Sequence, residues 1–374
     1  MKLSYDAVVI GAGIVGAACA CELARAGMRM AIVEAQIIGG GATAAGMGHI
    51  VVMDDSPAQL ALTQYSQSLW NELASQLPPN VEYDRCGTLW IAADDDEMQE
   101  VHRKQAVYAA AHVSTEILDA KALAEAEPNL RRPLAGALFV PSDAVIYPPC
   151  AAMYLVECAK QAGATLYLER AVAKAGKGRL VFSDGTEIFA ASIIHATGAS
   201  ASRLMPHLPV RKRKGHLVIT DRYPGFVRHQ LVELGYLKSA HSTSSDSVAF
   251  NVQPRRTGQL LIGSSRQYNN EGTGVDQNIL GAMLARAFDY IPSLQGLSSI
   301  RVWTGFRAAT PDKLPLIGPT EDASVFLATG HEGLGITTSL ATARLLTDHL
   351  LDRTPAISLA PYLPERFACE AAHA

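Results

Sequence analysis

Three glycines near the start of the chain have the spacing of a dinucleotide-binding turn. Gly11, Gly13 and Gly16 form a GxGxxG pattern. They lie between a strand predicted at residues 5–10 and a helix predicted at residues 14–27. Gly11 permits the tight turn, Gly13 lets backbone approach a pyrophosphate, and Gly16 lets the helix pack on the strand. The free N–H groups and partial positive charge of the helix start favour phosphate binding.

The residues after this turn favour FAD as the dinucleotide. Glu34 ends a second predicted strand, at residues 28–34. A carboxylate there accepts hydrogen bonds from a ribose and repels a 2′-phosphate, which disfavours NADP but does not separate NAD from FAD. The loop at residues 39–49 is rich in glycine and alanine, so backbone can approach a flavin ring closely. A flexible surface loop is the alternative, and the apolar residues 50–53 argue against it.

A second glycine-rich turn lies near the end of the chain. Residues 330–335 follow an apolar strand predicted at 324–329 and precede a helix predicted to run to about Leu351. This is a second helix start able to receive negative charge. Reduced flavin is anionic at N1–C2=O, so a helix start directed there would favour its reduction.

The middle of the chain is predicted to form strands with little helix between most of them, which suggests an antiparallel sheet. These strands are residues 81–92, 136–140, 215–220, 229–238, 247–253 and 259–263. The fold class is therefore α/β (α+β overall): a Rossmann-like FAD-binding domain with an inserted, mainly antiparallel β-sheet domain for the substrate. We expect residues 1–80, 143–214 and 301–374 in the first domain, and 81–142 and 215–300 in the second.

Composition and charge exclude several other classes of protein. The formal net charge of -4 provides no strong field for nucleic acid. The basic run Arg211–Lys214 is short and is predicted to be a solvated connection, with an anionic-ligand or partner patch as the alternative. The six cysteines form no CxxC pair or zinc pattern, which predicts reduced thiols and no metal site. The absence of a leader pattern and of long apolar segments predicts a cytoplasmic protein and leaves peripheral membrane contact open.

Taken together, the blocks at residues 11–16, 303–318 and 328–337 resemble the D-amino-acid oxidase, glycine oxidase and sarcosine oxidase family of FAD-dependent oxidoreductases. The resemblance covers nearly the whole chain, with the blocks in the same order. The phrases at residues 46–55 and 330–339 resemble two groups within it most: the flavin (beta) subunits of D-hydroxyproline dehydrogenases and the flavin subunit of hydrogen cyanide synthase.

The resemblance implies roles for particular residues. Arg307 matches the family's substrate-carboxylate arginine in the context Gly-x-Arg-Pro, although Ala308 replaces the proline. A guanidinium binds a carboxylate in a bidentate manner, whereas an ion pair between Arg307 and Asp312 is the structural alternative. His49 and Tyr236 are the further catalytic candidates, each weighed against a purely structural role.

The predicted FAD contacts come from both ends of the chain, and the absence of cysteine from residues 305–318 implies non-covalent FAD. Val172 is included by resemblance only, as a backbone contact to adenine, and His331 is either a flavin contact or a brace for the helix start. The predicted cofactor-binding residues are Gly11, Gly13, Ile14, Val15, Gly16, Glu34, Ala35, Gly41, Ala42, Thr43, Gly46, Met47, Gly48, His49, Val172, Thr197, Gly198, Gly305, Arg307, Gly330, His331, Glu332, Gly333, Leu334, Gly335, Ile336 and Thr337.

The activity implied by the resemblance is oxidation of a small amino or imino acid, with hydride transfer from its α-carbon to flavin N5. D-hydroxyproline or D-proline, oxidised to the cyclic imine, is the favoured substrate. A glycine- or sarcosine-type oxidase, a hydrogen cyanide synthase-like subunit, and an FAD-holding subunit active only in a complex are the alternatives. The electron acceptor is left open between oxygen, a quinone and a partner subunit in a hetero-oligomer.

Overall fold

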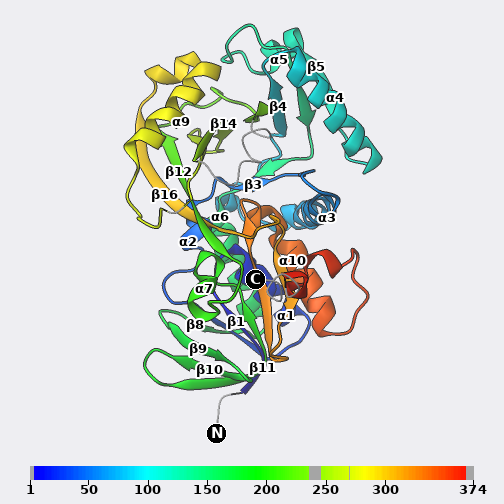
Figure 1. Ribbon diagram of the computed structural model, residues 1–374, viewed down its shortest axis with the longest axis vertical. Coiled ribbons are helices and arrows are strands. Elements are labelled where there is room, and N and C mark those ends of the chain that lie inside the picture. Colours follow the sequence, from blue (N-terminus) through cyan, green and yellow to red (C-terminus); the bar gives the residue numbers. More distant parts are fainter. Residues whose placement is uncertain (1–3, 236–245, 269, 368–374) are drawn as a thin grey trace.

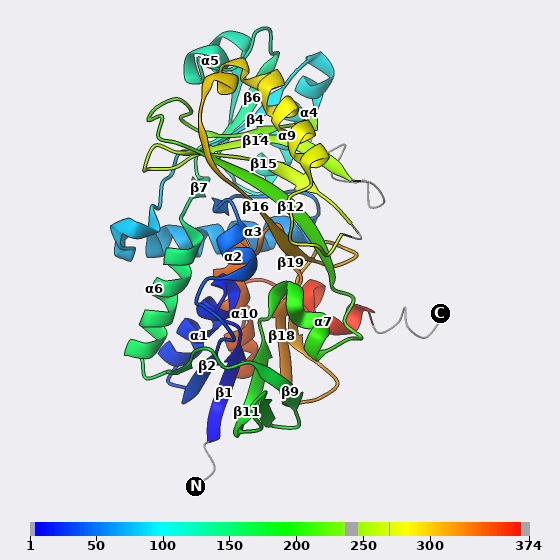
Figure 2. The same cartoon turned by 90° about the vertical axis from the view of Figure 1, so that its left-hand side faces the viewer.

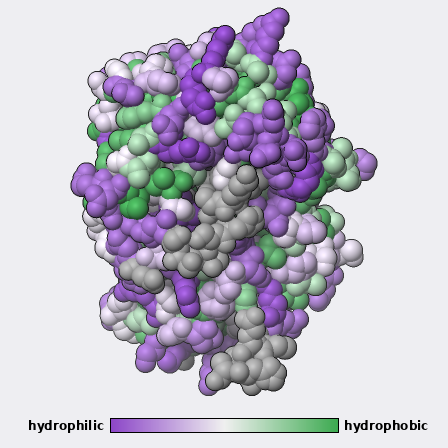
Figure 3. All heavy atoms as spheres, turned by 45° about the horizontal axis from the view of Figure 1, so that its top comes forward, coloured by the Kyte–Doolittle hydropathy of each residue, from purple (hydrophilic) through white to green (hydrophobic). Residues whose placement is uncertain are grey.

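The computed structural model describes residues 4–235, 246–268 and 270–367. Two sheets lie one above the other along the long axis, with the N-terminal strand in the lower one (Figure 1). On the face shown in Figure 3, polar side chains are interspersed with smaller apolar areas. Within the described ranges, no helix combines the length and the apolar character that crossing a bilayer requires. The predicted fold class is confirmed.

The lower sheet has eight strands, and its central strands run parallel. Its order is β17-β18-β11-β1-β2-β8, with β10 and β9 attached beside β11. Its strands are β1 (Ser4–Ile10), β2 (Met30–Val33), β8 (Thr165–Tyr167), β9 (Val172–Gly176), β10 (Arg179–Phe182), β11 (Glu187–His195), β17 (Leu316–Pro319) and β18 (Val325–Thr329). Strand β2 is buried along its whole length, as expected for a parallel strand covered on both faces.

Helices rich in alanine and leucine cover the lower sheet. Helix α1 (Ile14–Arg25) packs against both α6 (Pro148–Gln161) and α10 (Gly335–Leu350), and α10 also packs against α3 (Pro57–Leu73). Most of the α1 side chains buried in this core are small, including Ala17, Ala18 and Ala20, which lets three helices approach one another closely. This packing brings the two glycine-rich helix starts to the same edge of the sheet.

The upper sheet has nine strands in the order β19-β16-β12-β15-β14-β13-β4-β6-β5. Its neighbours pair antiparallel except β13 with β4. Its strands are β4 (Thr88–Ala92), β5 (Glu116–Asp119), β6 (Gly136–Val140), β12 (Arg211–Thr220), β13 (Gln230–Glu233), β14 (Ser247–Pro254), β15 (Leu260–Arg266), β16 (Ser299–Ala309) and β19 (His331–Glu332). The inserted, mainly antiparallel sheet is therefore present as predicted.

The two faces of the upper sheet have different coverings. Helix α9 (Gln277–Tyr290) packs on one face, where Met283 and Tyr290 share a core with Phe250. The opposite face contacts the segment that follows the first glycine-rich region, including Met47 and residues 51–53. Helices α4 (Asp95–Ala110) and α5 (Ala120–Ala126) lie at the β4–β6–β5 side, at the top of Figure 1.

Strands β12 and β16 cross the boundaries predicted between the two domains. The predicted breaks at 214/215 and 300/301 fall inside them, and Figure 2 shows both strands extending from the upper sheet toward α2 (Gly41–Ala45) and β19. The prediction that Arg211–Lys214 is a solvated connection is wrong: Arg213 and Lys214 are 3% and 2% exposed. Both residues are buried by the pairing of β12 with β16. Because β16 is far away in the sequence, four consecutive basic residues do not predict this pairing. The division into two domains stays a proposal.

Two other predicted strands are shorter in the structure. Residues 81–87 are not strand, because a 3₁₀ turn at Pro79–Val81 and a left-handed Glu82 (φ 53°) precede β4. Strand β13 is limited to Gln230–Glu233, and the predicted positions 236–238 lie outside the described residues.

A buried polar network links helix α3 to the short strand pair β3 (His49–Ile50) and β7 (Ala144–Val145). Asp143 Oδ1 accepts from Gln67 Nε2 at 2.8 Å and from the Val52 N–H at 3.2 Å. Its Oδ2 has no partner among the described residues. Burial, the largest effect, raises the pKa of Asp143 from 3.8 to about 7. Ionising this carboxyl in the folded protein is therefore unfavourable.

The Asp143→Asn variant should gain stability relative to the wild type as pH rises. Between pH 4 and 7 the folded protein holds a proton that the unfolded chain releases, so the wild type loses stability through this range. The asparagine keeps the Oδ1 acceptor and cannot ionise. Thermal unfolding at pH 5 and pH 8 measures the difference, with Asp289→Asn on the exposed side of α9 as control. A variant-to-wild-type difference equal at both pH values would contradict the prediction.

Candidate active site

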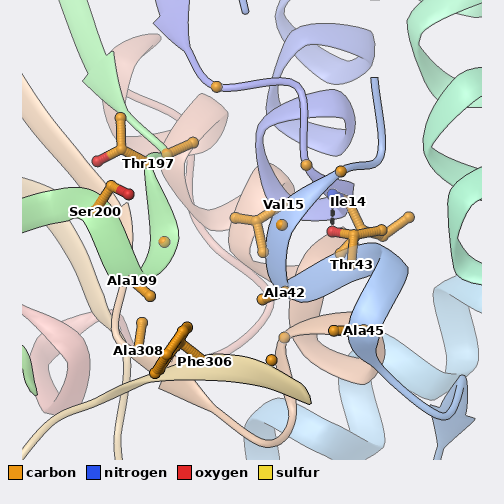
Figure 4. Close-up of a pocket in the computed structure, with 18 of the residues that line it drawn as sticks. Ile14, Val15, Ala42, Thr43, Ala45, Thr197, Ala199, Ser200, Phe306 and Ala308 are labelled. Atoms are coloured by element: carbon orange, nitrogen blue, oxygen red, sulfur yellow. Dashed lines mark hydrogen bonds between the residues drawn. The ribbon is translucent and has the colours of Figure 1, made fainter. Parts of the chain in front are cut away.

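A cavity of about 850 Å³ lies where the carboxyl ends of β1 and β2 meet the underside of β12 and β16. In open α/β sheets ligands bind outside the carboxyl ends of the strands. Small side chains face the pocket from several segments of the chain (Figure 4): Val15, Ala42, Thr43, Ala45, Thr197, Ala199, Ser200 and Ala308, together with the larger Phe306. The cavity has the volume of a cofactor site.

The first glycine-rich turn leaves no room for side chains. Gly11 has φ +104°, and a Cβ on it would lie 2.6 Å from Ala196 O. A Cβ on Gly16 would lie 1.9 Å from Gly11 O, so helix α1 packs on the turn as predicted. Gly13 provides no side-chain cap for α1, and Thr43 Oγ1 accepts from the Ile14 N–H at 3.0 Å (Figure 4). Gly13, Ile14 and Val15 line the cavity, so the helix-start N–H groups that remain without an intrahelical partner can donate to a ligand there.

The second helix start meets the first. A Cβ placed on Gly335, the first residue of α10, would lie 3.8 Å from Val15 Cγ2 at the start of α1. Residue Leu334 provides no side-chain cap. Two positive helix ends at one cavity favour an anionic, extended ligand such as a dinucleotide. The central expectation from the sequence, convergence of the two glycine turns, is confirmed.

Glu34 lines the cavity and ties the first turn in place. Its Oε2 accepts from the Ala12 N–H at 2.7 Å, and its Oε1 accepts from the Gln36 N–H at 2.8 Å. A carboxylate has about four acceptor positions, so both oxygens can still accept from a ribose hydroxyl. The residue types around the cavity therefore fit FAD: helix-start amides for a pyrophosphate, a carboxylate for a ribose, and closely packed backbone for a flat ring.

Arg307 brings a positive charge to the cavity from β16. It is half-buried, and its Nη1 donates to Ser265 O at 3.0 Å. Burial and then repulsion by Arg213 lower its pKa to about 9, so it stays protonated near neutral pH. The alternative pairing with Asp312 does not occur, because Asp312 accepts from Arg366 Nε at 2.7 Å. Over the described ranges, no carboxylate forms an ion pair with Arg307, which leaves its charge available to a ligand.

The neighbouring arginine is already compensated. Arg213 stands opposite Arg307 in the β12–β16 pairing and forms an ion pair with Glu332. Its Nη1 also donates to Tyr268 Oη at 2.9 Å. Glu332 is held in place, since it has a left-handed φ of 50° and its Oε2 accepts from the Gly333 N–H at 2.7 Å. Charge compensation at Arg213 makes Arg307 the stronger site for a ligand carboxylate.

Two predicted histidines line the cavity in their neutral form. Burial and then Arg307 lower the pKa of His49 to about 4, and its Nε2 has no partner among the described residues. Burial lowers the pKa of His331 to about 3, and its Nε2 lies 3.0 Å from Thr342 Oγ1 on α10. His331 therefore braces the start of α10, as one of its two predicted roles required, while it also forms part of the cavity wall.

Most of the predicted cofactor residues line the cavity, and four do not: Gly16, Gly330, Leu334 and Thr337. These four shape the turns around it. Thr337 Oγ1, for example, donates to His49 O at 2.9 Å and accepts from the Val51 N–H at 3.2 Å. Gly48 is a glycine chiefly because a Cβ there would lie 2.0 Å from Ile146 O. The third catalytic candidate, Tyr236, lies outside the described residues.

Several residues that line the cavity were not predicted from the sequence. One group of them lies on β12 and β16: Lys212, Gly215, His216, Leu217, Thr304, Phe306 and Ala308. Their strand alternation becomes informative only once the pairing of β12 with β16 is known. The described residues provide no group of three or more His, Cys, Asp or Glu side chains able to hold a metal.

Comparisons with known proteins agree with this geometry. A model of the DAO family, described as FAD dependent oxidoreductase, matches residues 6–349. Hydrogen cyanide synthase subunit HcnC of Pseudomonas aeruginosa is 28% identical, with 100% of this chain and 98% of the relative covered. The crystal structure of glycine oxidase from Geobacillus kaustophilus is 26% identical, with a TM-score of 0.87 and 98% and 99% of the two chains covered.

A third comparison extends the likeness in fold. L-proline dehydrogenase from P. horikoshii has a TM-score of 0.87 with 99% of both chains covered, and its 22% identity shows the fold alone. The family match spans both sheets and both glycine-rich turns. The chain therefore belongs to the DAO family of FAD dependent oxidoreductases, and its similarity to glycine oxidases is consistent with an FAD-dependent amino acid oxidase or dehydrogenase.

Proposed function

We propose that the protein oxidises a small amino or imino acid at the carbon that bears nitrogen, with D-hydroxyproline or D-proline as the first substrate to test. The observation that carries the proposal is the Arg307 guanidinium, which lines the cavity and has no carboxylate partner within the described ranges. The phrases at residues 46–55 and 330–339, which resemble D-hydroxyproline dehydrogenase flavin subunits, support the cyclic substrate.

In this proposal FAD is held without a covalent bond by the two helix starts and Glu34. The start of α1 would hold the pyrophosphate, Glu34 would accept from a ribose, and the Val172 backbone would contact the adenine. No cysteine is present among the described residues that line the cavity, which supports non-covalent binding. When bound, the flavin supplies a two-electron acceptor for the substrate C–H bond.

The residues of this chain hold the substrate and keep the site dry. Arg307 binds the carboxylate through two parallel N–H bonds and so fixes the direction of the α-carbon. Met47 and Leu217 belong to a buried apolar cluster at the cavity wall and exclude water from the reacting carbon. Neutral His49 can accept or donate one hydrogen bond to the substrate. The amine loses its proton before oxidation, and a proline-like substrate leaves as a cyclic imine.

A second candidate function is oxidation of glycine or sarcosine. It is favoured by the similarity to glycine oxidase and to HcnC, which is described as a subunit of hydrogen cyanide synthase. The same similarity supports the alternative that the chain passes electrons to a partner subunit of a hetero-oligomer. Oxygen and a quinone are the other acceptors that the proposal keeps, and the cytoplasmic location also stays a prediction.

Anaerobic addition of D-hydroxyproline or D-proline should bleach the flavin of the purified protein. Glycine and sarcosine at the same concentration are the comparison, and each L-isomer is the stereochemical control. Bleaching by glycine alone would replace the cyclic substrate with the second candidate. Persistent colour with every compound would favour a subunit active only in a complex.

Acid precipitation of the same preparation should leave the flavin in the supernatant, and a coloured pellet would contradict non-covalent binding.

Replacing Arg307 by Lys should lower kcat/KM by about 100-fold or more, because a single ammonium cannot reproduce two charge-assisted hydrogen bonds. Flavin content should stay at the wild-type level. Arg301→Lys is the matched control, since Arg301 lies on the same strand and is exposed. Steady-state kinetics and flavin absorbance measure both effects. Equal kcat/KM for Arg307→Lys and wild type would end the assignment of Arg307 to the carboxylate.

His49 should not determine the pH profile between pH 5 and 8. Its pKa is lowered to about 4, so it is already neutral throughout this range. The rise of kcat/KM with pH should instead follow loss of the substrate amine proton. His49→Gln should therefore change the rate without moving the midpoint of that rise. A midpoint that disappears in His49→Gln would show that His49 is the titrating group.

A further inference from the structure

The guanidinium of Arg307 rests against the bare backbone of Gly215 on β12. A Cβ on Gly215 would lie 2.6 Å from Arg307 Nη1, 3.0 Å from Nη2 and 3.1 Å from Cζ. Real Cβ atoms essentially never approach other atoms within 3.0 Å, so a side chain here would displace the guanidinium. Gly215 lies inside a strand and is not among the glycines with positive φ. Glycine is therefore required at position 215 by the position of the Arg307 guanidinium and not by the backbone conformation.

The path of the Arg307 side chain explains this contact. Strand β12 lies between β16, which carries Arg307, and β15, which carries Ser265. Gly215 pairs with Gly305, two residues before Arg307, and is thus its diagonal neighbour. Because Arg307 Nη1 reaches Ser265 O at 3.0 Å, the side chain must cross β12. Position 215 lies directly under that crossing.

The other neighbours of the guanidinium restrict it less tightly. A Cβ on Gly333 would lie 3.7 Å from Arg307 Nε, which is an ordinary van der Waals contact. Arg213, directly opposite Arg307 on β12, carries a like charge that opposes movement of Arg307 toward it. The Ser265 carbonyl attracts the guanidinium from β15. Among these neighbours, Gly215 is thus the position where a small increase in side-chain volume would displace the Arg307 guanidinium most.

We infer that Gly215 is a positioning residue: its lack of a side chain lets the Arg307 guanidinium lie against β12. The N–H groups of Arg307 that are not bonded to Ser265 O then have a defined direction toward the substrate carboxylate. This inference rests on the proposed carboxylate-binding role of Arg307. Preorganisation of this kind matters because a bidentate bond depends on the direction of both N–H groups.

The test is binding of pyrrole-2-carboxylate, a planar ring carboxylate that cannot be oxidised at an sp³ carbon, followed by the change in flavin absorbance. Gly215→Ala should raise its dissociation constant by about tenfold or more, the size expected for one weakened charge-assisted hydrogen bond. Flavin content and melting temperature should match the wild type. Gly281→Ala on α9 is the matched control, because nothing lies within 4 Å of a Cβ there.

A double-mutant cycle separates the inference from a general packing effect. In the Arg307→Lys background, Gly215→Ala should change the dissociation constant by less than about twofold, because the guanidinium that the alanine would displace is absent. An equal loss in both backgrounds would overturn the inference. Wild-type affinity in Gly215→Ala, with weak binding in Arg307→Lys, would overturn the inference and leave the proposed function intact. Wild-type affinity in both single variants would overturn the proposed function as well.

A further variant covers the case in which Gly215→Ala does not fold. The double variant Gly215→Ala/Arg307→Ala removes the guanidinium that the new Cβ would meet. Recovery of soluble, flavin-containing protein in the double variant would show that the clash with Arg307 was the cause, as the inference requires. Failure of the double variant to fold would show that position 215 is restricted by something else, and would overturn it.

Discussion

The structure depends on the meeting of two helix starts at one edge of the lower sheet. Neither α1 nor α10 is capped by the side chain of its own N-cap residue, and the Ile14 N–H of α1 donates to Thr43 Oγ1. Gly335 of α10 comes close to Val15 of α1. Unpaired backbone N–H groups and two aligned dipoles at one place are unfavourable unless an anion occupies it. The small residues of α1 and the glycines of both turns allow this close approach, and the family's dinucleotide provides the matching negative charge.

A second electrostatic constraint governs the upper wall of the cavity. After burial, the charge of Arg213 lowers the pKa of Arg307, and the charges of Arg213 and Arg307 lower the pKa of Arg266. The pKa values of Arg266 and Arg307 fall to about 9. Glu332 compensates Arg213 and comes from the same turn that begins α10. The turn before α10 and strand β12 are therefore joined by an ion pair at the cavity. A substrate carboxylate at Arg307 would reduce the repulsion that this cluster contains.

The upper sheet contributes glycines as well as charged residues to the site. Gly305 of β16 lies over α2, since a Cβ on it would be 2.3 Å from Ala45 Cβ. Gly215 of β12 lies under the guanidinium of Arg307. Such contacts set how closely the sheet can approach the cofactor region and in which direction its arginine points. If Arg307 binds the substrate carboxylate as proposed, backbone packing across three strands sets the position of the substrate.

The sequence by itself determined the parts of the site that are local in the chain. The spacing of Gly11, Gly13 and Gly16, the carboxylate at Glu34 and the turn before α10 each depend on a few consecutive residues, and strand–turn–helix units form from such local patterns. Tertiary structure decided the rest, because strand register joins residues far apart in sequence. Arg211–Lys214, predicted as a surface connection, is part of strand β12, and pairing with β16 buries Arg213 and Lys214 and places Gly215 beneath Arg307.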